Sequence, residues 1–401
     1  MFASFYTVLT GLNAFKEQLS VISDDIANTE TTAYKSSSTS FAEVLNSAMS
    51  TNVTDSVGNG VTVQNITTSW SQGSLSETGN SNDLAITGQG FFIVTDAAGT
   101  KYYTRAGEFQ YDQNSNLVTA DGLNVQGYKI NDDGSLGSLS DITISSDVIP
   151  ATATSNITAS VNLNSASATG DTYSATINTY DSLGNEVPIT ITFTESASNT
   201  WTWSASIDSA TGTASGSGTL TFGSSGALAS GTNPTITLNL SNGAVATQTI
   251  TWELYDSSGS SNGDVTQYAS SSTLSDQSQD GTAAGQLKSR SIDKSGVITG
   301  TYSNGETKKL YQIALAEFSN NEGLKRTGNS LYIETSTSGT ATVGIAGSSQ
   351  FGTLTSGSLE TSNVDMATET ANMIVAQRAY EACAKMFTVE SEILQTVINM
   401  K

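Results

Sequence analysis

Apolar residues near the N-terminus recur at alternating spacings of three and four positions, which predicts an amphipathic helix with one apolar seam. The helix is expected to end near Asn28, because a polar segment follows. The seam consists of Phe5, Val8, Leu12, Phe15, Leu19, Ile22 and Ile26.

A second, longer helix is predicted after Asp365, because apolar positions recur as far as Ile398 with no Gly or Pro between them. Its apolar positions form two overlapping seams, whereas a helix with a single partner needs only one stripe. Two interpretations stay open: a two-helix hairpin with a wide buried face, or a helix pair that also packs on other copies of the chain. The first seam consists of Met373, Ala376, Tyr380, Cys383, Phe387, Leu394 and Val397. The second consists of Val375, Ala379, Ala382, Met386, Val389, Ile393 and Met400.

Between the two helices, apolar and polar residues alternate in short runs such as Ile189–Phe193 and Ile250–Leu254, a pattern typical of half-buried strands. Turn pairs such as Asn242-Gly243 separate these runs. The expected fold class is therefore mainly β with paired long α-helices at the termini. We expect the β regions to be antiparallel sandwiches or barrels.

Charge is distributed unevenly along the 401-residue chain, which has 37 acidic and 15 basic side chains. No basic residue lies between Lys129 and Lys288, although this stretch contains 14 acidic residues. Such a change in charge suggests an inserted unit. We predict three nested domains: a terminal helical assembly domain (1–71 plus 359–401), a β-rich core domain (72–144 plus 286–358) and an inserted acidic all-β outer domain (145–285).

The composition argues against several kinds of function. Without histidine, and with Cys383 as the single cysteine, the chain cannot form a His-based catalytic triad, a zinc cluster or an internal disulfide. The acidic balance disfavours nucleic acids and anionic membranes. Residues 112–116 have the spacing that opens a calcium loop, but Leu117 and Leu123 replace its glycine and its bidentate acid. We expect no catalytic site, no cofactor and no metal.

Several segments resemble signatures of a known family, the rod and hook proteins of the bacterial flagellum. Residues 20–37 resemble the family's N-terminal signature, 76–94 and 102–128 its core signature, and 362–400 its last helix. Residues 179–193 are similar to the start of the outer domain of hook proteins. The motif residues are Asn28, Thr31, Lys35, Arg105, Gly107, Phe109, Gln377 and Arg378. The chain departs from the family at Ala33, where glycine is frequent, and at Cys383, where asparagine is usual.

The resemblance implies a structural subunit that assembles with itself into a hollow, curved tube, a universal joint carrying motor torque to the filament. Length and the acidic insert favour the hook group. The distal rod is the alternative, and a secreted β-rich adhesin or carbohydrate-active protein is the remote one. The implied partners are further copies, the hook cap, the distal rod, the hook–filament junction proteins and the flagellar type III export apparatus. The implied location is extracellular, after export without a cleaved signal peptide; the N-terminal segment has no apolar run typical of such a signal.

Overall fold

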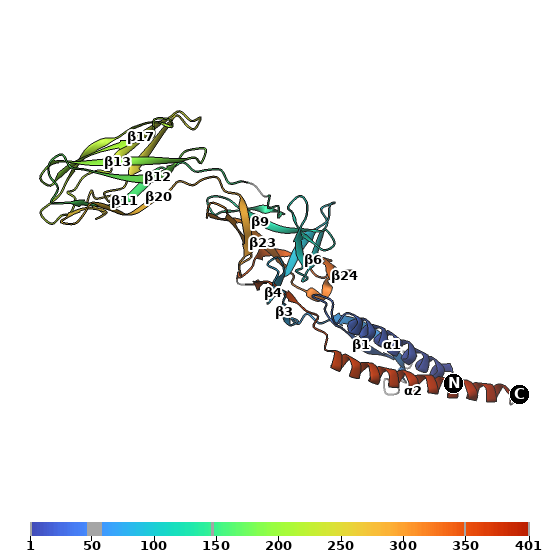
Figure 1. Ribbon diagram of the computed structural model, residues 1–401. Coiled ribbons are helices and arrows are strands. Elements are labelled where there is room, and N and C mark those ends of the chain that lie inside the picture. The colour runs from blue at the N-terminus through green and yellow to red at the C-terminus, as the bar shows by residue number, and fades with distance from the viewer. Residues whose placement is uncertain (1, 46–57, 146–147, 349, 400–401) are drawn as a thin grey trace. The chain divides into compact units, whose positions relative to one another are not determined.

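The computed structural model describes residues 2–45, 58–145, 148–348 and 350–399, shown in Figure 1. The chain forms two compact units. The first consists of Met1–Ser145, Arg290–Thr299 and Lys308–Lys401, and the second of Ser146–Ser289 and Gly300–Thr307. The finer division of the first unit into a helical and a core domain stays a prediction.

Two long helices lie at the ends of the chain, α1 (Phe2–Ala27) and α2 (Met366–Asn399). Asp365 caps α2, because its Oδ1 accepts hydrogen bonds from the backbone N–H groups of Ala367 (2.9 Å) and Thr368 (3.2 Å). The structure confirms that the chain is mainly β with a long helix at each end. That the helices form a coiled coil stays a prediction.

Strands occupy most of the chain between the helices, together with the short 3-10 helix η1 (Asn321–Gly323). The strands before the second unit are β1 (Ser37–Leu45), β2 (Gly58–Thr68), β3 (Leu75–Glu77), β4 (Leu84–Thr87), β5 (Phe91–Thr95), β6 (Lys101–Thr104), β7 (Phe109–Tyr111), β8 (Leu117–Thr119), β9 (Asn124–Ile130) and β10 (Leu136–Asp141). Those within it are β11 (Asn156–Asn164), β12 (Thr172–Tyr180), β13 (Glu186–Ala197), β14 (Thr200–Ser206), β15 (Gly212–Ser215), β16 (Ser217–Thr221), β17 (Thr235–Leu240), β18 (Thr247–Trp252), β19 (Val265–Tyr268) and β20 (Thr273–Gln279). The last group is β21 (Leu287–Ile292), β22 (Val297–Tyr302), β23 (Thr307–Glu317), β24 (Lys325–Gly328), β25 (Leu331–Ile333), β26 (Thr342–Ile345), β27 (Thr353–Ser356) and β28 (Ser358–Glu360).

A 12-stranded sheet, most of whose residues belong to the first unit, has the central order β21-β22-β23-β9-β5-β6-β25-β24. Aromatic residues fill its core, where Phe91 meets Phe318 and Tyr332 edge to face. Two small sheets join segments far apart in the sequence: β27 pairs with β4, and β28 pairs with β3. These pairings bring the chain that leads into α2 against the chain that follows β2.

Strands β1 and β2 form an antiparallel pair that packs on α1, so the predicted helical segment 1–71 also contains a sheet. The ring of Phe15 lies 5.8 Å from that of Phe41 on β1, and the Val61 N–H donates to Thr10 Oγ1 at 3.2 Å. The N-terminal helix therefore has two neighbours in the same chain, this strand pair and α2.

The second unit has a six-stranded and a four-stranded sheet whose apolar side chains share one core. In β13, Val187, Ile189, Ile191 and Phe193 are buried while their neighbours are not, as the alternation predicts. The ring of Trp252 meets that of Trp203 edge to face at 5.5 Å.

The expectation of purely antiparallel sheets is wrong in the second unit. Strand β11 pairs in parallel with β18 and with β19, and antiparallel with β20. An alternating pattern shows which residues face the core but carries no information about strand direction. The parallel pairing was therefore not visible in the sequence.

Candidate functional site: the terminal helices and their junction with the β core

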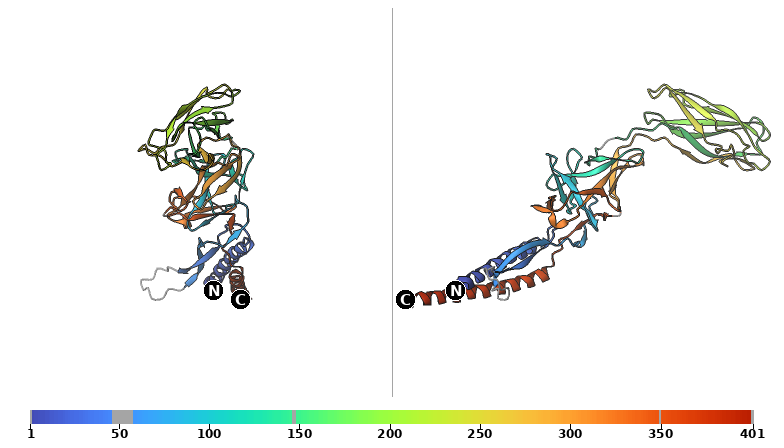
Figure 2. Two further views of the ribbon diagram at one scale, coloured as in Figure 1. Left: turned by 60° about the vertical axis from the view of Figure 1, so that its left-hand side comes forward. Right: turned by 180° about the vertical axis from the view of Figure 1, so that it is seen from behind.

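The first seam of α2 faces the N-terminal helix. Figures 1 and 2 show α1 and α2 side by side, and the ring of Phe5 lies 4.7 Å from that of Phe387. Ala376 is buried, and Gly11 lies so close to Cys383 that an added Cβ would be 3.4 Å from Sγ. The other described members of this seam are half-buried: Met373, Tyr380 and Leu394. The side chain of Val397 lies outside what the structure describes.

The second seam of α2 is open to solvent in the single chain. Val375 is 70% exposed, Met386 57%, Val389 52% and Ile393 48%, whereas Ala379 is half-buried. Further apolar residues of α2 are exposed that neither predicted seam included: Met366, Ile374 and Ile398. Met400 lies outside the described residues. A run of exposed apolar side chains along a helix marks an interaction surface.

The seam of α1 is divided between its two neighbours rather than facing one. Phe5 contacts α2, whereas Phe15 contacts β1. Ile22 is buried. The remaining members are half-buried: Val8, Leu12, Leu19 and Ile26.

The motif that follows α1 shapes the turn by which the chain leaves the helix. The Asn28 side chain donates to the Asp24 carbonyl at 2.9 Å, and Thr31 Oγ1 donates to Asn28 Oδ1 at 3.0 Å. Ala33 is fully buried with a φ of 55°, in the left-handed region that glycine occupies without strain. This conformation explains why glycine would suit position 33.

Asp25 ties this turn to β1. Its carboxylate is fully buried and accepts the Ser37 N–H at 3.0 Å and the Tyr34 hydroxyl at 2.9 Å. Burial raises the pKa of Asp25, although these two hydrogen bonds oppose the shift. Burial, reinforced by Asp25, raises the pKa of Tyr34 well above its ordinary value.

Three buried charged side chains meet where the chain segments adjoining the two helices reach the core. Lys35 and Glu360 are fully buried, Arg105 is 6% exposed, and Lys35 Nζ lies 2.5 Å from Glu360 Oε1. Arg105 Nη1 lies 3.2 Å from Glu360 Oε2, and the Gly73 N–H donates to Oε1 at 2.9 Å. Burial lowers the pKa of Lys35, and the nearby Arg105 adds to the shift while Glu360 opposes it. We call Lys35, Arg105 and Glu360 the junction cluster.

The structure thus brings together two residues that the sequence motifs singled out, Lys35 and Arg105, and adds Glu360, which those motifs missed. Asn363 was also missed: its side chain donates to the carbonyls of Ser69 (2.9 Å) and Ser71 (3.1 Å) and accepts the Ser36 N–H at 2.8 Å. Both residues lie at the start of the C-terminal segment, but nothing in one sequence indicates which distant residues they meet.

The remaining motif residues lie apart from the cluster. A Cβ on Gly107 would be 1.8 Å from the Leu84 carbonyl oxygen, so only glycine fits there. Phe109 is buried, with its ring 5.0 Å from that of Phe92. Gln377 and Arg378 are exposed on α2, where Arg378 pairs with Glu381 at 3.1 Å.

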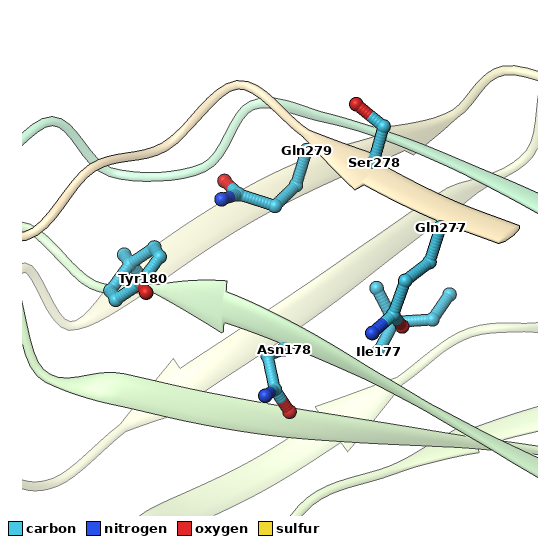
Figure 3. A pocket seen from close by; sticks show the side chains of 6 residues that line it. All are labelled: Ile177, Asn178, Tyr180, Gln277, Ser278 and Gln279. Carbon is cyan, nitrogen blue, oxygen red and sulfur yellow. The ribbon is translucent and has the colours of Figure 1, made fainter. Parts of the chain in front are cut away.

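A groove of about 330 Å³ lies in the second unit between β12 and β20. Figure 3 shows that Asn178 and Tyr180 come from β12, and Gln277, Ser278 and Gln279 from β20. None of the lining residues is Asp, Glu, Lys, Arg or His. Among the described residues, no three His, Cys, Asp or Glu side chains come together as metal ligands. No helix in the described ranges is long and apolar enough to cross a bilayer.

Three family models match the chain and define its class. They are described as the flagellar basal body protein FlaE D2 domain (residues 143–282), the flagellar hook protein FlgE/F/G D1 domain (85–162) and the flagellar basal body rod FlgEFG protein C-terminal (355–400). These matches place the chain in the class of flagellar rod and hook proteins.

Relatives of known name narrow the class. The flagellar hook protein FlgE of Salmonella typhimurium is 35% identical over 99% of this chain and 100% of its own length. That of Escherichia coli K12 is 33% identical over 99% and 100%, and that of Borreliella burgdorferi 32% over 100% of both. The chain therefore belongs to the flagellar hook protein FlgE family. The crystal structure of Helicobacter pylori flagellar hook protein FlgE2 shares the fold, with a TM-score of 0.53 and 16% identity over 71% of this chain and 100% of that chain.

Proposed function

We propose that this chain is a structural subunit of the bacterial flagellar hook and assembles with itself through its terminal helices. The observation that carries the proposal is the exposed second seam of α2, which lacks a neighbour among the described residues while the first seam packs on α1. Burying such a surface against further copies is favourable in proportion to the apolar area removed from water. The hook names of the full-length relatives favour the hook over the distal rod.

The proposal extends to the arrangement of the polymer. The terminal helical segments, 1–71 and 359–401, would line the central channel. The β-rich core, 72–144 plus 286–358, would form a middle shell, and the acidic insert 145–285 would form the outer surface. The uneven charge supports this order, because a region with 14 acidic and no basic residues between Lys129 and Lys288 suits a surface that faces water.

Partners and location follow from the same proposal. The subunit would meet the distal rod at one end of the tube, and the hook cap and the hook–filament junction proteins at the other. It would reach the cell exterior through the flagellar type III export apparatus without a cleaved signal peptide. The proposed role is mechanical and requires no catalysis or cofactor.

Electron microscopy of the purified chain tests the proposal. At high concentration the full chain is expected to form short, curved, hollow tubes. A chain that ends at Asp365 lacks α2 and should remain monomeric at the same concentration. Tubes formed by the shortened chain would show that α2 is not the assembly element, and an absence of tubes from the full chain would contradict self-assembly.

A further inference from the structure

We infer that Glu360 is a positioning residue, which holds the chain segments that lead into the two terminal helices against the β core of the first unit. The inference rests on the proposed function in one respect: a hook subunit that carries torque must transmit force between its terminal helices and its β core. The evidence that Glu360 holds these segments comes from the geometry of the junction cluster.

Glu360 joins three parts of the first unit through a single side chain. Lys35 follows the turn after α1, and the Gly73 N–H belongs to the segment after β2. Arg105 follows β6 in the core and also donates to the carbonyls of Gly88 and Gly90. One carboxylate thus holds the chain leaving α1, the chain entering β3 and a loop of the core.

The main chain of Glu360 takes part in the same connection. Its carbonyl accepts the Ala33 N–H at 2.8 Å, and Glu360 is paired with Leu75 in the small sheet of β28 and β3. Five residues beyond Glu360, Asp365 caps α2. Glu360 therefore acts on both chain segments that connect the core with the helices.

The junction cluster contains two cations and one carboxylate, so the loss of stability on substitution should depend on which of the three charges is removed. When all three groups are ionised, one carboxylate faces two cations, and Lys35 and Glu360 are fully buried. Removing Glu360 leaves two buried cations close together without a counter-charge, which is strongly unfavourable. Removing Lys35 leaves the Arg105–Glu360 pair, which is balanced. A role in packing alone would not predict this asymmetry.

Hydrogen–deuterium exchange on the full-length monomer, below the concentration at which it assembles, tests the inference. In Glu360→Gln, amides in residues 30–37 and 357–365 should exchange at least about 100-fold faster than in the parent. In Lys35→Met the same amides should stay within about tenfold of the parent, because a balanced pair remains. Glu381→Gln is the matched control, since it removes the exposed partner of Arg378 and should change neither segment.

The double variant Lys35→Met/Glu360→Gln keeps the test decisive if Glu360→Gln alone unfolds. It has only one unpaired buried cation, so it should be better protected than Glu360→Gln. Parent-like exchange in Glu360→Gln, equal damage from Lys35→Met, or a double variant worse than Glu360→Gln would each overturn the inference. Because the experiment is done on the monomer, a failure of the chain to form tubes would contradict the proposed function and leave this result standing.

Discussion

Val389→Asn is the most direct test of whether the exposed seam of α2 is an assembly surface. Val389 is 52% exposed in the single chain, so its replacement removes little buried area from the monomer. Fully burying a Val side chain is worth about 1.5–3 kcal/mol, and covering its exposed half by another copy should therefore contribute about 1 kcal/mol. Asparagine loses this gain and buries an amide without a partner, at a further cost of about 1–3 kcal/mol.

The two effects together weaken each subunit contact by about 2–4 kcal/mol. Since 1.4 kcal/mol corresponds to a factor of ten, the critical concentration for assembly should rise roughly 30- to 1,000-fold. Sedimentation of polymer over a range of protein concentrations measures this value. The melting temperature of the monomer should hardly change, because Val and Asn have similar helix propensities and the side chain is exposed.

Val245→Asn is the matched control, because Val245 is 62% exposed and belongs to the second unit, whereas both helices belong to the first. It makes the same chemical change and should leave the critical concentration at the parent value. If Val389→Asn assembles at the parent concentration, the seam is not an interface. If both variants lose assembly alike, the loss reflects polarity in general and not this surface.

Two further predictions concern stability. Gly107→Ala should lower the free energy of unfolding by about 3 kcal/mol in urea titrations, because its Cβ would meet the Leu84 carbonyl oxygen at 1.8 Å. Gly223→Ala is the control, because the nearest atom to a Cβ at this position lies 3.8 Å away. An equal loss of unfolding free energy in this variant would refute the steric explanation. Above pH 10.0, the ordinary pKa of tyrosine, stability should fall as pH rises, because burial and Asp25 keep the Tyr34 proton on the folded chain while the unfolded chain releases it. Tyr34→Phe should make that fall shallower in the same titrations; an unchanged slope would show that other groups cause it.

Helices and strands whose apolar residues recur at a regular spacing were predictable from the sequence. The seven-residue pattern from Phe5 to Ile26 predicted α1, and the uninterrupted apolar positions after Asp365 predicted α2. Strand alternation was equally informative in β13, where every second residue from Val187 to Phe193 is buried. These features depend on residues close together in the chain, so their physical cause is present in a short stretch of sequence.

Features that depend on distant segments were not predictable. The parallel partners of β11 depend on the route of the chain between strands, which an alternating pattern does not encode. The junction cluster joins residues 35, 105 and 360, and only two of them, Lys35 and Arg105, lie in motifs that drew attention. A single sequence does not show whether a glutamate is buried or exposed, so the role of Glu360 could not be predicted from it.

The exposed seam and the junction cluster together explain how an apolar surface can produce an ordered polymer instead of an aggregate. An exposed apolar stripe attracts any similar surface, and by itself it fixes neither angle nor register. Charged residues of α2 such as Arg378 and Glu381 are exposed on the same helix, which narrows the apolar stripe. If Glu360 holds the segments that lead into the helices against the core, it narrows the range of orientations in which each copy presents that stripe. Neighbouring copies can then bury the stripe and pack their β cores in a small set of related arrangements, which favours an ordered tube over an aggregate.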